Sequence, residues 1–297
     1  MAHQDVASAD LAPALPAVRA IGPADLKDAL ARGLDDFWAM PTHVIFISLI
    51  YPVVGLTLGR AAFGYDVIPL LYPLAAGFAL IGPFAAIGLY ELSRRRERGL
   101  DTSWKHAFDV VHSPSFGPIV ALGLLLLVIF GVWLAVAHAI YIANFGYGPE
   151  PAPLDFIRQV LTTPAGWTLI VVGNGVGFLF ALVVLAISVV SFPLLLDRNV
   201  GAMAAAATSV RAVIKNPVTM ALWGLFIAGV LVIGSLPFFF GLAVVMPVLG
   251  HSTWHLYRKV VEPDLSPPNE VHHPVKARRY AADFPAALFP WGREDRP

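Results

Sequence analysis

Residues Ile81–Gly99, IGPFAAIGLYELSRRRERG, join an apolar helical stretch to a strongly basic end. The basic end follows Glu91 and holds four arginines: Arg94, Arg95, Arg96 and Arg98. Charges of this density do not lie in hydrocarbon, and arginines beside a membrane span stay on the cytoplasmic side. We therefore assign the four arginines a topology-setting role. Two later stretches with an internal proline end in charge in the same way, namely SFPLLLDR (Ser191–Arg198) and MPVLGHSTWHLYRK (Met246–Lys259).

The composition is that of a polytopic membrane protein. Hydrophobic residues make up 57% of the 297 residues and charged residues 13%, whereas about a quarter of a soluble domain is charged. The 20 basic and 20 acidic residues cancel, so net charge indicates no nucleic acid or other charged partner. The expected partners are the lipid bilayer and other inner-membrane proteins. The absence of cysteine excludes disulfides, thiolate metal sites and cysteine nucleophiles.

The chain is expected to be all-α, because its apolar runs have the length of membrane helices. The pattern predicts six spans: Val44–Leu58, Val67–Tyr90, Pro118–Ile142, Trp167–Leu196, Val218–Gly234 and Phe238–Tyr257. Apolar residues at helical spacing also predict amphipathic helices from Pro23, within a basic loop over residues 93–116, at Leu154–Leu161 and at Gly201–Lys215. The fourth span is long enough that it must tilt, kink or protrude.

The distribution of positive charge predicts the orientation. With the N-terminus inside, 18 of the 20 lysines and arginines lie on the cytoplasmic side, and only Arg60 and Arg158 lie outside. Both ends are therefore expected in the cytoplasm. We divide the chain into a disordered tail (1–22), a six-span membrane domain (23–261) and a C-terminal cytoplasmic tail (262–297). No cleaved leader is expected.

A degenerate threefold repeat of helical hairpins would account for the positions of several prolines. Each unit would contain an amphipathic helix, a proline, an outbound span and an inbound span with an internal proline. The opening prolines are Pro41, Pro114 and Pro217, and the inbound ones are Pro83, Pro193 and Pro247. The alternative is that proline is common at helix starts and tolerated within spans. The sequence leaves both interpretations open.

A polar cluster is predicted at the cytoplasmic ends of the spans. His251 and His255 are four residues apart and share one helix face, and the topology brings His43 and Glu91 to the same depth. Such a set would suit a metal or a proton path. The competing interpretation is interfacial anchoring or internal hydrogen bonding, favoured because Trp254, Tyr257 and Arg258 surround His255 like an interfacial belt. We expect no metal and no cofactor.

The start of the fourth span carries small and polar residues: Gly173, Asn174, Gly175 and Gly177. Small residues allow helices to approach closely, and an asparagine can hydrogen-bond between helices. A broken helix that binds a substrate, as in transporters, is the functional alternative. Close packing is the preferred interpretation.

Four blocks of the chain resemble a bacterial family of predicted integral membrane proteins, domain of unknown function 2189. The blocks are GPFAAIGLYELSRRRERG (82–99), SFPLLLDRNVG (191–201), KNPVTMALWG (215–224) and MPVLGHSTWHLYRKVV (246–261). The resemblance extends over roughly residues 40–261. It implies a bacterial inner-membrane location and brings no catalytic residues.

Three functions remain after these observations. The leading one is a non-enzymatic scaffold, assembly or regulatory factor for other membrane proteins. The first alternative is a small-solute or ion transporter that uses Asn174 and the proline kinks. The second is a metal- or haem-binding redox subunit that uses His43, His251 and His255. No catalytic motif at a recognisable spacing supports an enzyme.

Overall fold

The computed structural model describes residues 15–40, 70–78, 80, 82–147, 153–236 and 241–263, and these residues confirm the all-α prediction. Their helices are α1 (Pro23–Ala39), α3 (Leu71–Phe78), α4 (Gly82–Ala85), α5 (Ile87–Glu97), the 3₁₀ helix η3 (Trp104–His112), α6 (Phe116–Phe145), α7 (Pro153–Thr162), α8 (Pro164–Ser188), α9 (Ser191–Asp197), α10 (Ala202–Lys215), α11 (Pro217–Ser235) and α12 (Leu242–Val260). An isolated bridge pairs Val18 with Val261.

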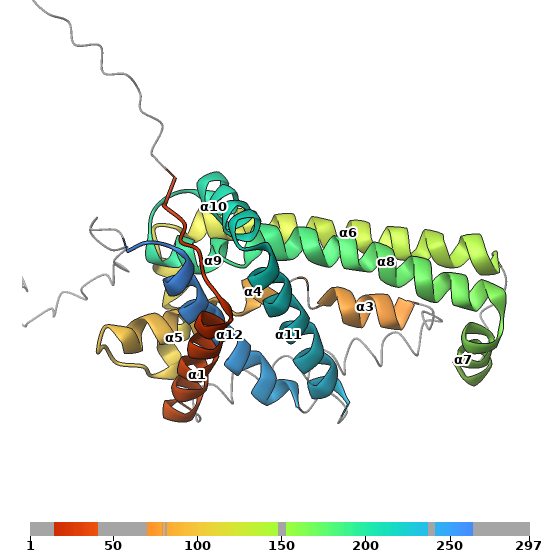
Figure 1. Ribbon diagram of the computed structural model, residues 1–297, viewed down its shortest axis with the longest axis horizontal. Coiled ribbons are helices and arrows are strands. Elements are labelled where there is room, and N and C mark those ends of the chain that lie inside the picture. The colour runs from red at the N-terminus through yellow and green to blue at the C-terminus, as the bar shows by residue number, and fades with distance from the viewer. Residues whose placement is uncertain are drawn as a thin grey trace, which may run out of the picture.

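Three helices in the described residues are long and apolar enough to cross a membrane. They are α6, α8 continued by α9 (Pro164–Asp197), and α11. Figure 1 shows α6 and α8 side by side along the long axis, with α11 inclined beside them. These helices correspond to the third, fourth and fifth predicted spans. The first predicted span, Val44–Leu58, lies outside the described residues, and α12 is not among the three.

The fourth predicted span is not one straight helix. It is interrupted at Val189 and Val190, where α8 ends and α9 begins. Pro193 follows at the third position of α9 and has no N–H to donate to the carbonyl four residues before it. The Val190 N–H, which has lost its place in the helix, donates to Ser209 Oγ of α10 at 3.2 Å. The expected kink is therefore a break that a neighbouring helix caps.

The second predicted span, Val67–Tyr90, is also divided, and its basic end is helical. The described part consists of α3, α4 and α5. The prediction of a basic loop from residue 93 is wrong for its first part, because α5 continues to Glu97 and Arg98 follows as its C-cap. Cations at the last turn of a helix are favourable partners of the helix dipole, and Glu91 pairs with Arg94 one turn later.

Helix α1 lies along the C-terminal half of α12, and the two helices approach very closely. A Cβ atom added at Gly33 would be 2.0 Å from Ser252 Oγ. The buried face of α1 is Ala29, Gly33, Asp36 and Phe37, and Leu34 is 39% exposed. Small residues fix this contact because they let the two backbones meet.

The amphipathic helix α10 buries mainly small side chains. Ala205, Thr208, Ser209 and Ala212 are buried, whereas Met203 is 85% exposed. The buried face is formed by small and hydroxyl-bearing side chains because α10 packs against α8 and α9 at short range. Close approach, more than hydrophobicity, selects the inward side of this helix.

Residues 17–22, expected to belong to a disordered tail, are bonded to the body of the molecule. Arg19 N donates to Val260 O at 2.7 Å, and Glu262 N donates to Ala17 O at 3.0 Å. Asn216, the residue before α11, accepts from Ile21 N at 2.8 Å and donates to Arg19 O at 3.0 Å. The segment before α1 is thereby held against the end of α12 and the start of α11.

Candidate functional site

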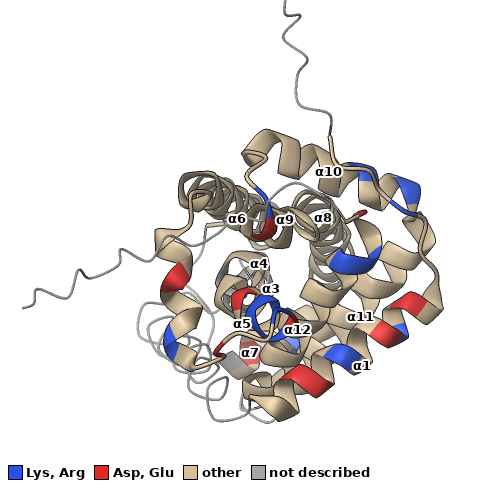
Figure 2. Ribbon diagram, turned by 90° about the vertical axis from the view of Figure 1, so that its left-hand side faces the viewer, with Lys and Arg blue, Asp and Glu red and all other residues tan. Residues whose placement is uncertain are grey.

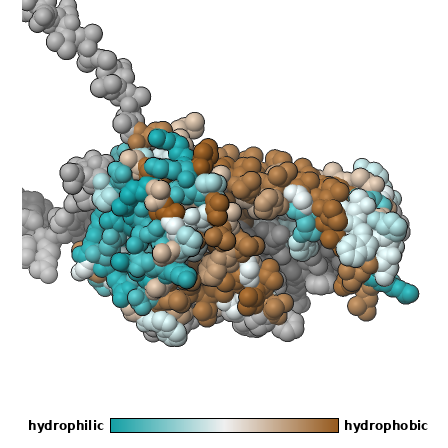
Figure 3. Space-filling model, in the orientation of Figure 1, coloured by the Kyte–Doolittle hydropathy of each residue, from teal (hydrophilic) through white to brown (hydrophobic). Residues whose placement is uncertain are grey.

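One end of the molecule gathers most of its hydrophilic surface. In Figure 3 this end is teal, and the length of α6, α8 and α11 is brown. Figure 2 looks onto the same end, where charged residues lie on α1, α5, α9 and α12. We call the buried part of this end the polar cap. Its ionisable members, each at most 7% exposed, are Asp36, Glu91, Arg94, Asp197 and His251.

Asp36 of α1 accepts hydrogen bonds from two other helices, α5 and α12. Its Oδ2 accepts from Ser93 Oγ of α5 at 2.6 Å and from His255 Nε2 of α12 at 2.9 Å. Its Oδ1 pairs with the Arg96 guanidinium. A buried carboxylate is tolerable only when its oxygens are bonded in this way. Asp36 therefore ties α1 to α5 and α12.

Ser93 connects Asp36 to His251. Because the Ser93 hydroxyl donates to Asp36, its oxygen accepts from His251 Nδ1, at 2.6 Å. An imidazole that carries its hydrogen on Nδ1 presents Nε2 as an acceptor. His251 is fully buried, and its Nε2 has no hydrogen-bond partner among the described residues. The order His251–Ser93–Asp36 places the serine in the middle, so its hydroxyl hydrogen is directed at Asp36 and the imidazole is not placed to remove it.

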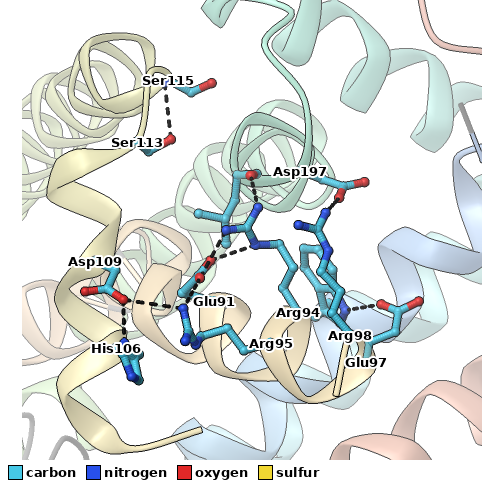
Figure 4. A network of polar contacts seen from close by, with 12 residues as sticks. Glu91, Arg94, Arg95, Glu97, Arg98, His106, Asp109, Ser113, Ser115 and Asp197 are labelled. Carbon is cyan, nitrogen blue, oxygen red and sulfur yellow. Dashed lines mark hydrogen bonds and ion pairs between the residues drawn. The ribbon is translucent and has the colours of Figure 1, made fainter. Parts of the chain in front are cut away.

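Glu91 forms a separate pair deeper in α5. Arg94 Nε and Nη2 donate to its two oxygens at 2.7 and 3.0 Å, a bidentate arrangement. Arg94 Nη1 also donates to Leu196 O of α9 at 3.2 Å. Figure 4 shows both side chains directed into the space between α5 and α9, with Arg95 reaching Asp109 on the other side. The pair joins α5 to the end of the α8–α9 span.

Asp197 at the end of α9 completes the polar cap. It accepts from Tyr257 Oη at 2.7 Å and pairs with Arg98 at 3.3 Å (Figure 4). Arg258 contacts Asp197 and bridges to Glu97, which also accepts from Trp254 Nε1 at 3.1 Å. Trp254 and Tyr257 are each 1% exposed. They are packed inside the cap, not placed as a belt facing lipid.

The electrostatic balance at Asp36 favours the charged form. Burial alone raises the pKa of the Asp36 carboxyl, but the hydrogen bonds from His255 and Ser93, together with the electrostatic attraction of the two histidines, outweigh it. The net result is a pKa below the ordinary value of 3.8. Asp36 is therefore ionised in the folded protein and holds its donors by charge-assisted bonds.

The predicted cluster of His43, Glu91, His251 and His255 is brought together in part. His251 and His255 share one network through Ser93 and Asp36, whereas Glu91 belongs to the Arg94 pair. His43 lies outside the described residues. Within the described parts of the chain, no three His, Asp or Glu side chains are arranged to hold a metal ion.

Asp36 and Ser93 were missed by sequence reasoning. Asp36 is one of several acids in α1, and its only distinguishing signal is its spacing from Ala29 and Gly33 along one helix face. Ser93 lies between charged residues that attract attention to themselves. The contacts that reveal both residues join positions 57 to 219 apart in the chain.

The small-residue motif of α8 lies beside a cavity far from the polar cap along the chain's long helices. Asn174 Oδ1 accepts from Tyr72 Oη of α3 at 2.7 Å, which is the interhelical bond expected of it. Gly177 packs close to Trp133 of α6, where an added Cβ would lie 2.9 Å from the ring. A Cβ added at Gly173 or at Gly175 would have no atom within 4 Å. Close packing therefore explains Gly177, and not Gly173 or Gly175.

Comparison with known families finds a match to the middle of the chain. The model of the family described as predicted integral membrane protein (DUF2189) matches residues 71–197. The match contains the block at 82–99 and the first part of the block at 191–201, while the blocks at 215–224 and 246–261 lie beyond it. No curated protein and no solved structure matches the chain. Over α3 to α9, this protein is therefore similar to the DUF2189 family of predicted integral membrane proteins.

Proposed function

We propose that this protein is a non-enzymatic scaffold, assembly or regulatory factor for other proteins of the bacterial inner membrane. The observation that carries the proposal is the mutual pairing of the polar cap. Asp36 and Asp197 are each bonded to donors from neighbouring helices, and Glu91 pairs with Arg94 of its own helix, which in turn donates to Leu196 O of α9. Groups committed to one another in this way stabilise a fixed arrangement of helices and are poorly placed to exchange protons with a substrate.

We also propose six spans with both ends in the cytoplasm, so that residues 23–261 form one membrane domain between two tails. The polar cap supports this orientation, since it collects the topology-setting Arg94, Arg95, Arg96 and Arg98 at one end of the molecule. Positive residues gathered at one end of a helical bundle mark its cytoplasmic side. The apolar exteriors of α6, α8 and α11 would then face lipid or partner helices.

Purification of the tagged protein from native membranes in a mild detergent tests the scaffold. The expected result is a membrane protein recovered in stoichiometric amount. A matched control is an unrelated tagged inner-membrane protein of similar abundance, which should not recover it. Repeated purification of the chain alone, under conditions that preserve known membrane complexes, would contradict the proposal.

The transporter alternative is favoured by one observation, the polar Tyr72–Asn174 pair at an otherwise apolar cavity between spans. Solute flux into proteoliposomes that Asn174→Leu abolishes would support transport and count against the scaffold. For the redox alternative, ligation through His251 Nδ1 or His255 Nε2 would break a hydrogen bond in the Asp36 network, whereas the unpartnered His251 Nε2 could bind a metal without doing so.

A further inference from the structure

The partly open cavity beside Asn174 is lined by four helices. Its volume is about 330 Å³, and its wall includes Tyr72 of α3, Trp133 and Tyr141 of α6, Phe156 of α7, and Gly173 and Asn174 of α8. Ligand pockets in proteins have volumes of roughly 300–1,000 Å³ and are lined mainly by apolar and aromatic side chains with a few polar groups. The cavity meets both conditions.

The chemistry of the wall favours a hydrocarbon occupant. None of the described lining residues is charged. The polar groups are already bonded: Tyr72 Oη donates to Asn174 Oδ1, Asn174 Nδ2 donates to Ile170 O, and Trp133 Nε1 donates to Pro73 O, at 2.7, 2.7 and 2.9 Å. A charged or strongly hydrated solute would lose water here without compensation, whereas an alkyl chain would not.

The position of the cavity puts it within reach of lipid. It extends from Phe156 and Val160 of α7 to Asn174, ten residues, or ~15 Å, beyond the start of α8. Its walls α6 and α8 are candidate membrane spans, and the flanking Val171 and Phe178 are each 66% exposed. In Figure 1, α7 lies across the far end of α8. A chain descending from the membrane surface beneath α7 would enter without crossing water.

We propose that this cavity is a binding site for one acyl chain of a membrane lipid. The chain packs on the rings of Trp133, Tyr141 and Phe156 and ends at the Tyr72–Asn174 pair. Gly173 supports this use, because its missing side chain leaves the space open instead of admitting a neighbouring helix. The site is independent of the scaffold proposal, since a lipid could bind whether or not a protein partner does.

The test is a titration of the full-length, delipidated protein in detergent with dioleoyl phosphatidylethanolamine, with bound lipid counted by native mass spectrometry. The wild type is expected to hold one lipid more tightly than any further ones. Gly173→Leu places a side chain on the cavity wall, at a position where an added Cβ meets no atom within 4 Å, and should weaken this first binding at least tenfold. Gly175→Leu is the matched control, because Gly175 has the same open surroundings but does not line the cavity.

Competition separates the tail from the headgroup and does not depend on a variant. Oleic acid should displace the first lipid, and dihexanoyl phosphatidylethanolamine, which has the same headgroup but short chains, should not. Equal lipid binding by Gly173→Leu and Gly175→Leu would overturn the proposal. So would the absence of a distinct first lipid in the wild type, or displacement by the short-chain lipid alone.

Discussion

Gly33 marks the closest contact between α1 and α12. An alanine there would place its Cβ 2.0 Å from Ser252 Oγ and 2.6 Å from the Ser252 backbone nitrogen, so the helices must separate. We expect Gly33→Ala to destabilise the protein by about 1–3 kcal/mol, the usual cost of overpacking. Thermal unfolding in detergent measures the effect. Gly117→Ala, at a position with open space, is the control and should leave the melting temperature unchanged or slightly raised.

Asp36 gives the polar cap its dependence on pH. The pKa of Asp36 in the folded protein lies below 3.8. The ionised carboxylate therefore stabilises the fold fully when the pH is above the pKa of Asp36 in the unfolded chain, and this stabilisation is lost as the pH falls through its pKa in the folded protein. Asp36→Asn should therefore lower stability at neutral pH by about 1.5–3 kcal/mol, the range for hydrogen bonds to charged groups. The measurement is the melting temperature of both proteins as a function of pH. A difference that persists unchanged below the folded pKa would contradict this account.

The break between α8 and α9 depends on a side chain from another helix. Ser209 Oγ is the acceptor for the buried Val190 N–H. Ser209→Ala leaves that donor unpaired, which costs about 1–3 kcal/mol, and hydrogen exchange should increase at the junction of the two helices. Ser235→Ala is the control, because the Ser235 hydroxyl bonds only to Leu231 O in its own helix. Equal effects of the two substitutions would show that the cap is unimportant.

The helices and their contacts differ in how far sequence could predict them. The runs that became α6, α8 and α11 were predictable, since their apolar length is itself the signal. The division of the second span and the inward faces of α1 and α10 were not, because they follow from which helices approach closely. The network of Asp36 with His255 joins residues 219 apart, and no local pattern encodes such a pairing. The histidine pair was predictable from its spacing, and its partners were not.

The whole molecule offers a direct test of orientation because it contains no cysteine. Single cysteines at exposed positions can then be labelled without background. Tyr147, beyond α6, is 92% exposed, whereas Leu100 and Met203 near the polar cap are 50% and 85% exposed. A membrane-impermeant maleimide should label Tyr147→Cys in intact cells, and Leu100→Cys and Met203→Cys only after permeabilisation. The reverse pattern would place the polar cap outside the cytoplasm.

The bridge between Val18 and Val261 restricts the number of times that the chain between them can cross the membrane. Two residues in contact outside the hydrocarbon occupy the same aqueous compartment, so the polypeptide joining them traverses the bilayer an even number of times. Helices α6, α8 with α9, and α11 are three candidates for such traverses. If all three cross the bilayer, a further crossing between Val18 and Val261 is required, and the proposed six-span path provides it.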